Sequence, residues 1–405
     1  MRISIYKIYL ILIFYIAPFI DAFSGYLILS GIISEGGVGS PSQLFRLFLI
    51  FISIYIISKN KRLFYFSLFS IFYCILLEYI VFQLHLSFFG FIVGFVYDSK
   101  ILYLLLIFLT LYYMNTINYI SFIKLLKYLN NYILLMSLFL ILPFFLGIGF
   151  PTYYEGTFGT KGFFSAGNGL GIFMGAGFLL SIYYWQYTRE KYSLLKTLII
   201  CFSTIIIGTK TVFIITLIGL IFIIYYLNNK YLSRFVFILV ISSVTYFYIE
   251  IIDILNIIFD VVFKRLSNNE SFISFIMSNR DVYFMEAINN ISYEGLYILR
   301  ILFGMGAYIS FRNPYEIING IDTLESDFAD IFFMYGIIGL ILYFIIIFLL
   351  IRSLFIKRLF FLCFIFFLFI SHSLVAGHIL FNGMSGTLFP ILAILTISLK
   401  NKEQM

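Results

Sequence analysis

Six basic residues of this chain stand apart from its main groups of positive charge. Arginine binds phosphate oxygens through paired hydrogen bonds, and lysine neutralises the same charge as a point cation. We expect the six to face one side of a membrane and to form a basic cluster for a phosphate or pyrophosphate group. The alternative is that each of them pairs with an acidic residue on that side. They are Arg46, Lys161, Lys210, Arg280, Arg300 and Arg312.

Three acidic residues close together could supply a proton acceptor. Glu325, Asp327 and Asp330 lie at the start of an apolar segment. Asp327 and Asp330 are three residues apart, so they share one face of a helix. A carboxylate at a partly dehydrated rim can act as a general base. We expect Glu325 to be this base and Asp327 to be its substitute. The alternative for Asp327 is an acid at a helix start, stabilised by the helix dipole.

The composition places these residues in a membrane protein. Of the 405 residues, 62% are hydrophobic and only 11% are charged, against about 25% charged residues in an ordinary soluble domain. So few charges could not cover a soluble surface, and intrinsic disorder needs low hydrophobicity. Runs of about 20 residues are apolar on every side, which favours transmembrane helices over a β-barrel. We therefore predict one all-α polytopic membrane domain over residues 1–405.

About twelve transmembrane helices are predicted, and residues 88–97 are expected to be a re-entrant or interfacial piece. The N-terminal apolar run is too long for a signal peptide, so it is interpreted as the first helix. The cysteines Cys74, Cys201 and Cys363 fall inside spans and are expected to be small buried residues. The predicted spans are 5–33, 44–58, 63–85, 100–118, 132–149, 163–186, 195–208, 211–227, 235–254, 328–350, 359–376 and 385–399.

The distribution of charge predicts the orientation of these helices. Lys and Arg concentrate in the short cytoplasmic loops of membrane proteins. With the N-terminus inside, most of the 26 basic residues fall in cytoplasmic loops, with only Glu190 and Glu403 of the 19 acidic ones. Both termini are therefore expected in the cytoplasm. Nine basic residues are expected outside the cytoplasmic set: the six named above with Lys100, Lys264 and Arg265. The net charge of +7 is a topology signal and does not indicate a nucleic-acid partner.

One connection is much longer than the others. Residues 255–327 are expected to form a large periplasmic loop between the ninth and tenth helices. Apolar residues recur every three positions within it: Val282, Met285, Ile288 and Ile291. This spacing predicts an amphipathic helix that lies on the membrane or caps a cavity. The alternative is a loop with a structural role only.

No metal or cofactor site is expected. The histidines His85, His372 and His378 have no metal-binding spacing.

Glycines recur every four residues, at positions 167, 171 and 175, which places them on one helix face. The string resembles a nucleotide-binding loop, but close packing of helices explains it better.

Several stretches together resemble the Wzy-type polymerases of bacterial O-antigen and capsular polysaccharide, whose superfamily includes the O-antigen ligases. The resemblance covers most of the chain from Pro18 to about Gly339. The ligases usually carry a His-Asn pair where this chain has Glu325, which favours a polymerase. In order, the stretches are Pro18 to Gly25, Gln43-Leu-Phe-Arg46, Lys161 to Gly171, Gly208-Thr-Lys210-Thr211, Arg280 before the amphipathic helix, Leu302-Phe-Gly304-Met-Gly306, and Glu325-Ser-Asp327 running into Tyr335-Gly-Ile-Ile-Gly339.

The resemblance implies a multi-pass glycosyltransferase that works on the periplasmic face of the bacterial inner membrane. Its donor would be a growing glycan on undecaprenyl pyrophosphate, and its acceptor a single repeat unit on a second carrier. Arg280 and Lys210 would stabilise the pyrophosphate charge. Glu325 would orient or deprotonate the acceptor hydroxyl. The other four isolated basic residues would assist Arg280 and Lys210. No metal or cofactor is required, and a chain-length regulator protein is an expected partner.

Three other functions remain open at this point. An O-antigen ligase would use the same donor with a different acceptor. A flippase for lipid-linked oligosaccharides has a similar number of helices, but such transporters usually show two similar halves, and this sequence shows no internal repeat. A structural or receptor-like membrane protein is compatible with the same composition.

Overall fold

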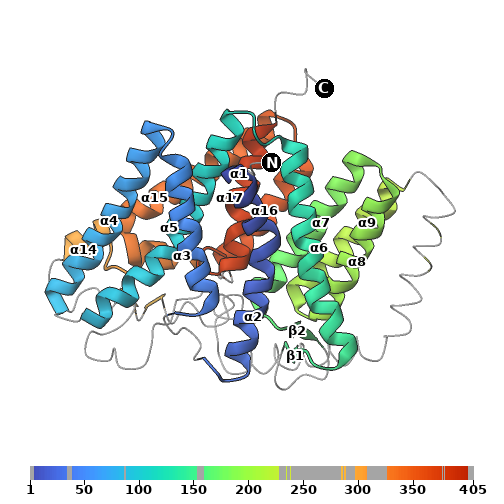
Figure 1. Cartoon of the computed structure of the whole chain (residues 1–405), viewed down its shortest axis with the longest axis horizontal. Coiled ribbons are helices and arrows are strands. Elements are labelled where there is room, and N and C mark those ends of the chain that lie inside the picture. Colours follow the sequence, from blue (N-terminus) through green and yellow to red (C-terminus); the bar gives the residue numbers. More distant parts are fainter. Residues whose placement is uncertain are drawn as a thin grey trace.

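The computed structural model describes residues 4–33, 39–85, 88–152, 159–227, 234, 238, 284–285, 287–288, 297–307, 326–375, 377 and 379–399. Within this part of the chain, the structure consists of helices and one short hairpin (Figure 1). Five of its helices are long and apolar enough to cross a membrane, and several others are shorter but equally apolar. These helices support the predicted class, an all-α protein embedded in a membrane.

The first half of the chain forms helices that run up and down the bundle. They are α1 (Ile5–Ile11), the π-helical turn η1 (Leu12–Ile16), α2 (Ala17–Leu29), α3 (Pro41–Ile57), α4 (Lys61–His85), α5 (Phe88–Thr116) and α6 (Phe122–Leu146). The first three of these elements follow one another without a break, as expected for one span. Residues 88–97 are the first turns of α5, and their re-entrant or interfacial placement stays a prediction.

The second half of the described chain begins with a hairpin and continues with helices. Its elements are β1 (Phe150–Pro151), β2 (Thr160–Gly162), α7 (Gly167–Thr188), α8 (Lys191–Ile207), α9 (Lys210–Tyr226), α14 (Tyr297–Phe303), α15 (Asp327–Ile356), α16 (Phe360–Val375) and α17 (Gly383–Ser398). The span predicted at residues 235–254 lies outside the described residues, apart from position 238, so the total of twelve stays a prediction.

Positive charge gathers at one end of the bundle, the upper end in Figure 1. The start of α1 reaches the turn between α5 and α6, where Ser4 Oγ and Tyr119 OH are 2.8 Å apart. Lys357, after α15, donates to the carbonyl of Leu399 behind α17 at 2.6 Å. Both described ends of the chain therefore lie at this end. Its basic residues are Lys7, Lys59, Lys61, Arg62, Lys124, Lys127, Arg189, Lys191, Lys196, Arg352, Lys357 and Arg358.

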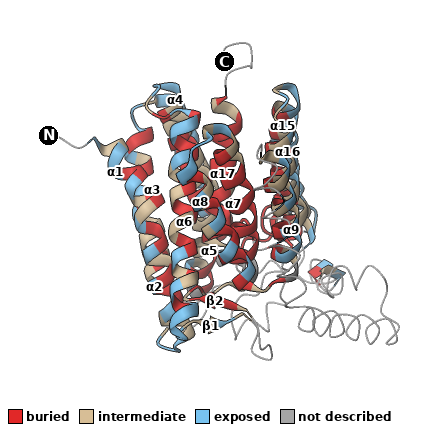
Figure 2. Ribbon diagram, turned by 90° about the vertical axis from the view of Figure 1, so that its right-hand side faces the viewer, coloured by how far each residue is buried: buried red, intermediate tan, exposed pale blue. Residues whose placement is uncertain are grey.

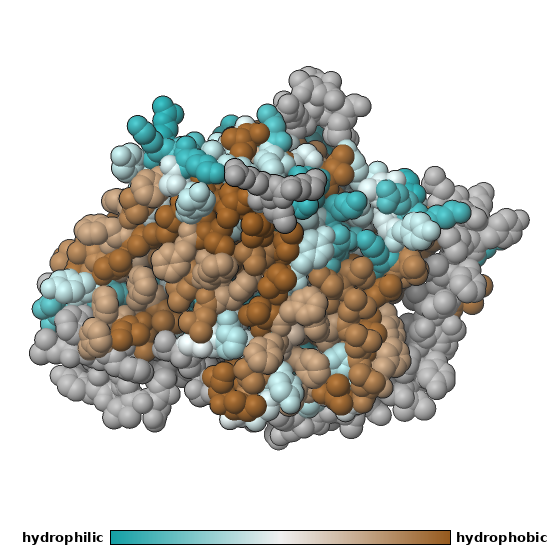
Figure 3. Space-filling view, viewed as in Figure 1, coloured by the Kyte–Doolittle hydropathy of each residue, from teal (hydrophilic) through white to brown (hydrophobic). Residues whose placement is uncertain are grey.

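The molecular surface follows the same division. In Figure 3, hydrophilic residues line the upper edge, and a broad hydrophobic belt covers the helices below it. Apolar side chains on the outer helices, such as Phe69 and Phe72 of α4, are exposed in this belt. Such a belt suits contact with lipid. That the basic end faces the cytoplasm stays a prediction from the distribution of charge.

Helix α7 lies at the centre of the bundle, and Figure 2 shows it and α17 buried over most of their length. Helix α7 packs against α6, α8, α9, α16 and α17. A Cβ on Gly175 would lie 3.0 Å from Ile215 Cδ1 of α9, and one on Gly177 would lie 3.0 Å from Ile133 of α6. Small residues let helices approach closely where lipid offers no hydrophobic driving force. Of the three glycines that the sequence predicts on one packing face, Gly171 and Gly175 are confirmed in that role, and Gly171 faces Thr209 of the turn before α9.

The cysteines behave as predicted. Cys74, Cys201 and Cys363 are buried and free, on α4, α8 and α16. All three are therefore small buried residues, as the sequence predicts.

Helix α15 is broken at Gly336, whose backbone angles are φ 67° and ψ −169°. Only glycine adopts this region at low cost. The break exposes helix carbonyls, and the segment after α14 satisfies them: Met305 N donates to Phe333 O at 2.8 Å, and Gly306 N donates to Met334 O at 3.2 Å. Such pairing is required in a membrane, where no water replaces a lost backbone hydrogen bond.

The long predicted loop at residues 255–327 falls mostly outside the described residues. Four of its residues show how the predicted amphipathic helix meets the bundle. Phe284 packs on the rings of Phe328 and Phe333, and Ala287 is fully buried. Met285 and Ile288 are exposed. The face toward the bundle is therefore offset by one position from the apolar stripe that the sequence indicated.

Replacement of Gly336 by alanine should destabilise the protein. The backbone conformation alone would cost about 1–3 kcal/mol, and the new Cβ would overlap the backbone of Leu302 and Phe303. We expect a lower apparent melting temperature in detergent. Gly167→Ala is the matched control, because a Cβ there meets only Thr152 Cγ2 at 3.6 Å. Equal melting temperatures for the two variants would contradict the assigned role of the break.

Candidate functional site

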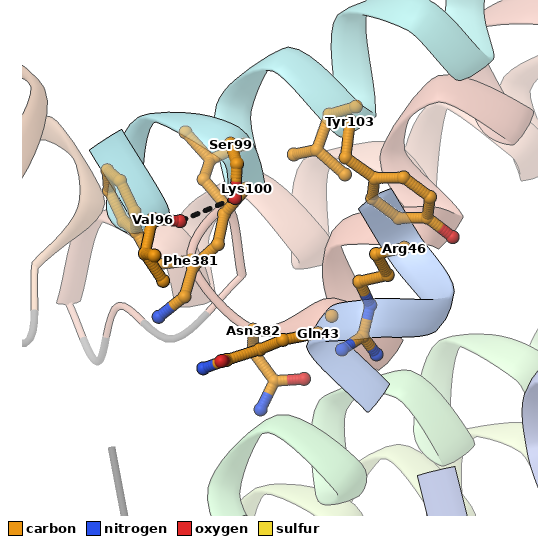
Figure 4. A pocket seen from close by; sticks show the side chains of 11 residues that line it. Gln43, Arg46, Val96, Ser99, Lys100, Tyr103, Phe381 and Asn382 are labelled. Carbon is orange, nitrogen blue, oxygen red and sulfur yellow. Dashed lines mark hydrogen bonds between the residues drawn. The ribbon is translucent and has the colours of Figure 1, made fainter. Parts of the chain in front are cut away.

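A small polar pocket lies at the end of the bundle opposite the basic turns. Its volume is about 40 Å³, and it is enclosed by the start of α3, the middle of α5 and the turn that leads into α17. Figure 4 shows that the polar ends of Lys100, Arg46, Gln43 and Asn382 lie toward the lower side of the view. The polar lining residues are Gln43, Arg46, Ser99, Lys100, Tyr103 and Asn382.

Arg46 is the residue of the predicted basic cluster that the pocket contains. Its Nη2 is 2.7 Å from Asp21 Oδ1 on α2, and its side chain is 18% exposed. Its Nη1 donates to Ser42 Oγ, which in turn donates to Asp21 Oδ1 at 2.5 Å. For Arg46, the alternative of an acidic partner is therefore correct. The pair also explains Asp21, because a lone carboxylate inside a membrane span is costly.

Lys100 supplies the second positive charge, and the sequence-based cluster did not include it. Its Nζ lies 3.9 Å from the centre of the Tyr97 ring, a cation–π contact. It interacts electrostatically with Arg46 and with Asp330 of α15. The signal for it was present in the sequence, because a single lysine interrupts the apolar run that becomes α5.

Two glycines make room for the polar side chains of the pocket. A Cβ on Gly383 would overlap the Arg46 guanidinium, and one on Gly169 would overlap the amide of Asn382. The Asn382 Oδ1 accepts from Met384 N at 3.0 Å and so caps α17. The pocket is thus built on helix ends whose backbone is fixed, which holds Arg46 and Asn382 in place.

The acidic residues at the start of α15 are deeply buried. Asp327 is 0% exposed and Asp330 is 1% exposed. The Asp327 Oδ2 accepts from Ser373 Oγ at 2.6 Å and from Ile379 N at 3.1 Å. Asp327 therefore ties α15 to the end of α16 and to the connection that leads to Asn382. These contacts favour the structural alternative for Asp327, as a positioning residue at a helix start.

Among the described side chains, those of the predicted site residues Lys161, Arg300 and Asp327 do not line this pocket. Lys161 is in β2, is 8% exposed, and its Nζ is 3.4 Å from Ser165 O. Arg300 of α14 is also 8% exposed, and its Nη1 is 3.7 Å from Met305 Sδ. Lys210 is the first residue of α9, and its side chain is not described. Three further predicted residues lie outside the described part of the chain: Arg280, Arg312 and Glu325.

The chemistry available in the pocket is the binding of an anion. Two cationic side chains and two amide side chains, Gln43 and Asn382, surround it. Among the described residues there is no group of three or more His, Cys, Asp or Glu side chains that could hold a metal ion. A phosphate group is an anion of matching chemistry, because guanidinium, ammonium and amide groups all donate hydrogen bonds to it.

The pair of Arg46 and Asp21 should be needed for stability. Asp21→Asn leaves the arginine with an uncompensated charge, which we expect to lower the free energy of unfolding by about 3 kcal/mol. Adding Arg46→Met removes the charge and should recover most of this loss. Thermal unfolding in detergent of the two single variants and the double variant measures the coupling. Additive effects of the two changes would contradict the contact.

Comparison with protein-family models, with curated proteins and with solved structures finds no match to this chain.

Proposed function

We propose that this protein is a membrane glycosyltransferase that polymerises polysaccharide repeat units linked to undecaprenyl pyrophosphate, as the Wzy-type polymerases do. It would act on the periplasmic side of the bacterial inner membrane. The observation that carries the proposal is the pocket with Arg46 and Lys100, which lies at the end of the bundle opposite the basic turns. With the basic turns in the cytoplasm, this end would face the periplasm.

A lipid-linked pyrophosphate suits such a pocket for a physical reason. The polyprenyl chain would remain in the bilayer beside the apolar helices, and its pyrophosphate would reach the ends of the helices, where Arg46 and Lys100 lie. Because Asp21 already balances one positive charge, the pocket carries a net charge close to one cation. This charge favours the leaving pyrophosphate, on which negative charge develops.

The proposed reaction is a single displacement. The oxygen of the acceptor sugar hydroxyl forms a bond to the anomeric carbon of the donor, and the bond between that carbon and the pyrophosphate oxygen breaks. Glu325 would take the hydroxyl proton. Undecaprenyl pyrophosphate leaves, and Arg280 and Lys210, with Arg300, Arg312 and Lys161, would complete the cationic surroundings that Arg46 and Lys100 begin. Asp327 would hold the start of α15, two residues after Glu325 in the sequence.

Replacement of Lys100 by methionine should abolish chain extension. The substitution keeps the length of the side chain and removes the charge that the pyrophosphate needs. We expect surface polysaccharide with single repeat units and no long chains, at an unchanged level of the protein. Lys61→Met is the matched control, because Lys61 is exposed at the opposite end. Long chains in the Lys100→Met strain would remove the pocket from the mechanism.

Glu325→Gln tests the assigned base. The amide cannot accept the hydroxyl proton, so we expect chain extension to fall by about 10²-fold or more. Gel banding of surface polysaccharide also separates the rival functions. Loss of a polymerase leaves single units on the surface, loss of a ligase leaves none, and loss of a flippase leaves lipid-linked units on the cytoplasmic side. Near-normal chains in the Glu325→Gln strain would exclude Glu325 as the base.

A further inference from the structure

Two carboxylates lie inside the bundle, apart from the pocket. Glu78 on α4 and Asp98 on α5 are both 0% exposed and interact electrostatically with each other. Asp98 is two positions from Lys100, which places it about 200° around the helix from the pocket. A Cβ on Gly94, one turn before Asp98, would overlap the carboxylate of Glu78. The absence of a side chain at this glycine lets Glu78 lie directly against α5.

Each carboxylate accepts one hydrogen bond and has one oxygen without a partner among the described residues. Glu78 Oε1 accepts from Ala307 N at 2.5 Å, and Asp98 Oδ1 accepts from Tyr335 OH at 2.6 Å. Glu78 Oε2 and Asp98 Oδ2 are buried and accept none. Buried polar atoms without a hydrogen-bond partner are rare in folded proteins, and each one needs a physical explanation, such as a water, an ion or a proton.

No described positive charge balances the pair. The ionisable groups that interact with it electrostatically are Cys74 and Tyr73 on α4 and Tyr335 on α15. All three are neutral in their protonated forms.

Two ionised carboxylates at this place would be very unfavourable. Each buried ion costs several kcal/mol in lost hydration, and two like charges repel each other. One proton removes one charge and converts an oxygen without a partner into a hydrogen-bond donor. A metal ion would need more ligands than the described residues offer here.

We propose that Glu78 and Asp98 form a proton-binding site within the membrane, at which one bound proton neutralises one of the two carboxylates. The site lies where α4, α5 and α15 meet the segment that follows α14. Tyr335 precedes the break of α15, and Ala307 ends the segment that satisfies the broken helix. The proton therefore stabilises the docking of α14 and its following residues on α4, α5 and α15. A rise in pH would remove the proton and loosen this docking.

Infrared spectroscopy of the whole protein in detergent detects the proton directly. A protonated carboxyl has a carbonyl stretch that is distinct from that of a carboxylate, and it shifts in D2O. We expect such a band in the wild-type protein at neutral pH and its loss in the double variant Glu78→Gln/Asp98→Asn. Glu190→Gln, at an exposed acid of the opposite end, should keep the band. A spectrum unchanged by the double variant would overturn the proposal.

The pH dependence of unfolding gives a second measurement. The folded protein would hold a proton that both carboxyls release in the unfolded chain, so the folding equilibrium should weaken as pH rises, by up to tenfold per pH unit. The double variant should lose this dependence. Its amides keep the oxygens that accept from Ala307 N and Tyr335 OH, and they carry their own N–H donors. They therefore remove the charge repulsion without losing these hydrogen bonds, and the variant should fold.

Sodium and potassium titrations separate a proton from a metal cation at the same place. With choline as the reference ion, a proton site predicts the same melting temperature in all three salts for the wild-type protein. A rise in melting temperature with sodium or potassium that is absent from the double variant would overturn the proposal in favour of a cation site.

Discussion

The structure depends on one constraint, which is that polar groups inside a membrane must find their partners within the protein. The break of α15 at Gly336 meets this requirement through Met305 and Gly306, which donate to the exposed carbonyls. Asp21 and Arg46 meet it by pairing with each other. Each solution joins segments that are far apart in the sequence. The helices are therefore held in register by a few polar contacts as well as by apolar packing.

The same constraint decides which charges can take part in chemistry. Lys357, in one of the basic turns, donates to Thr396 O and Leu399 O and so caps the end of α17. Lys100 is different, because it lies part-buried in a pocket beside a second cation. Asp21 already balances Arg46, so Lys100 supplies the charge that an anion would meet in the pocket. A binding role explains this arrangement better than a structural one.

Sequence reasoning recovered the features that depend on local pattern. Apolar runs gave the helices, and glycines four residues apart gave the packing face of α7. It did not recover features that depend on tertiary partners. The hydrogen-bond donors to Asp327 could not be foreseen, because Ser373 and Ile379 follow it by 46 and 52 positions. The electrostatic interaction of Glu78 with Asp98 could not be foreseen either, because it depends on the space that Gly94 leaves for the Glu78 carboxylate.

The contacts of α14 and α15 give a packing reason for two of the stretches that carry the sequence resemblance. Two of its stretches, Leu302-Phe-Gly304-Met-Gly306 and Tyr335-Gly-Ile-Ile-Gly339, form one packing unit in which Gly304 lies on the backbone of Met334 and Gly336 on that of Leu302. Packing is a sufficient reason for these glycines. They therefore support a shared fold more strongly than a shared reaction. The case for polymerisation rests instead on the charged residues, and among the described ones it rests on Arg46 and Lys100, since their surroundings offer an anion what no apolar helix can.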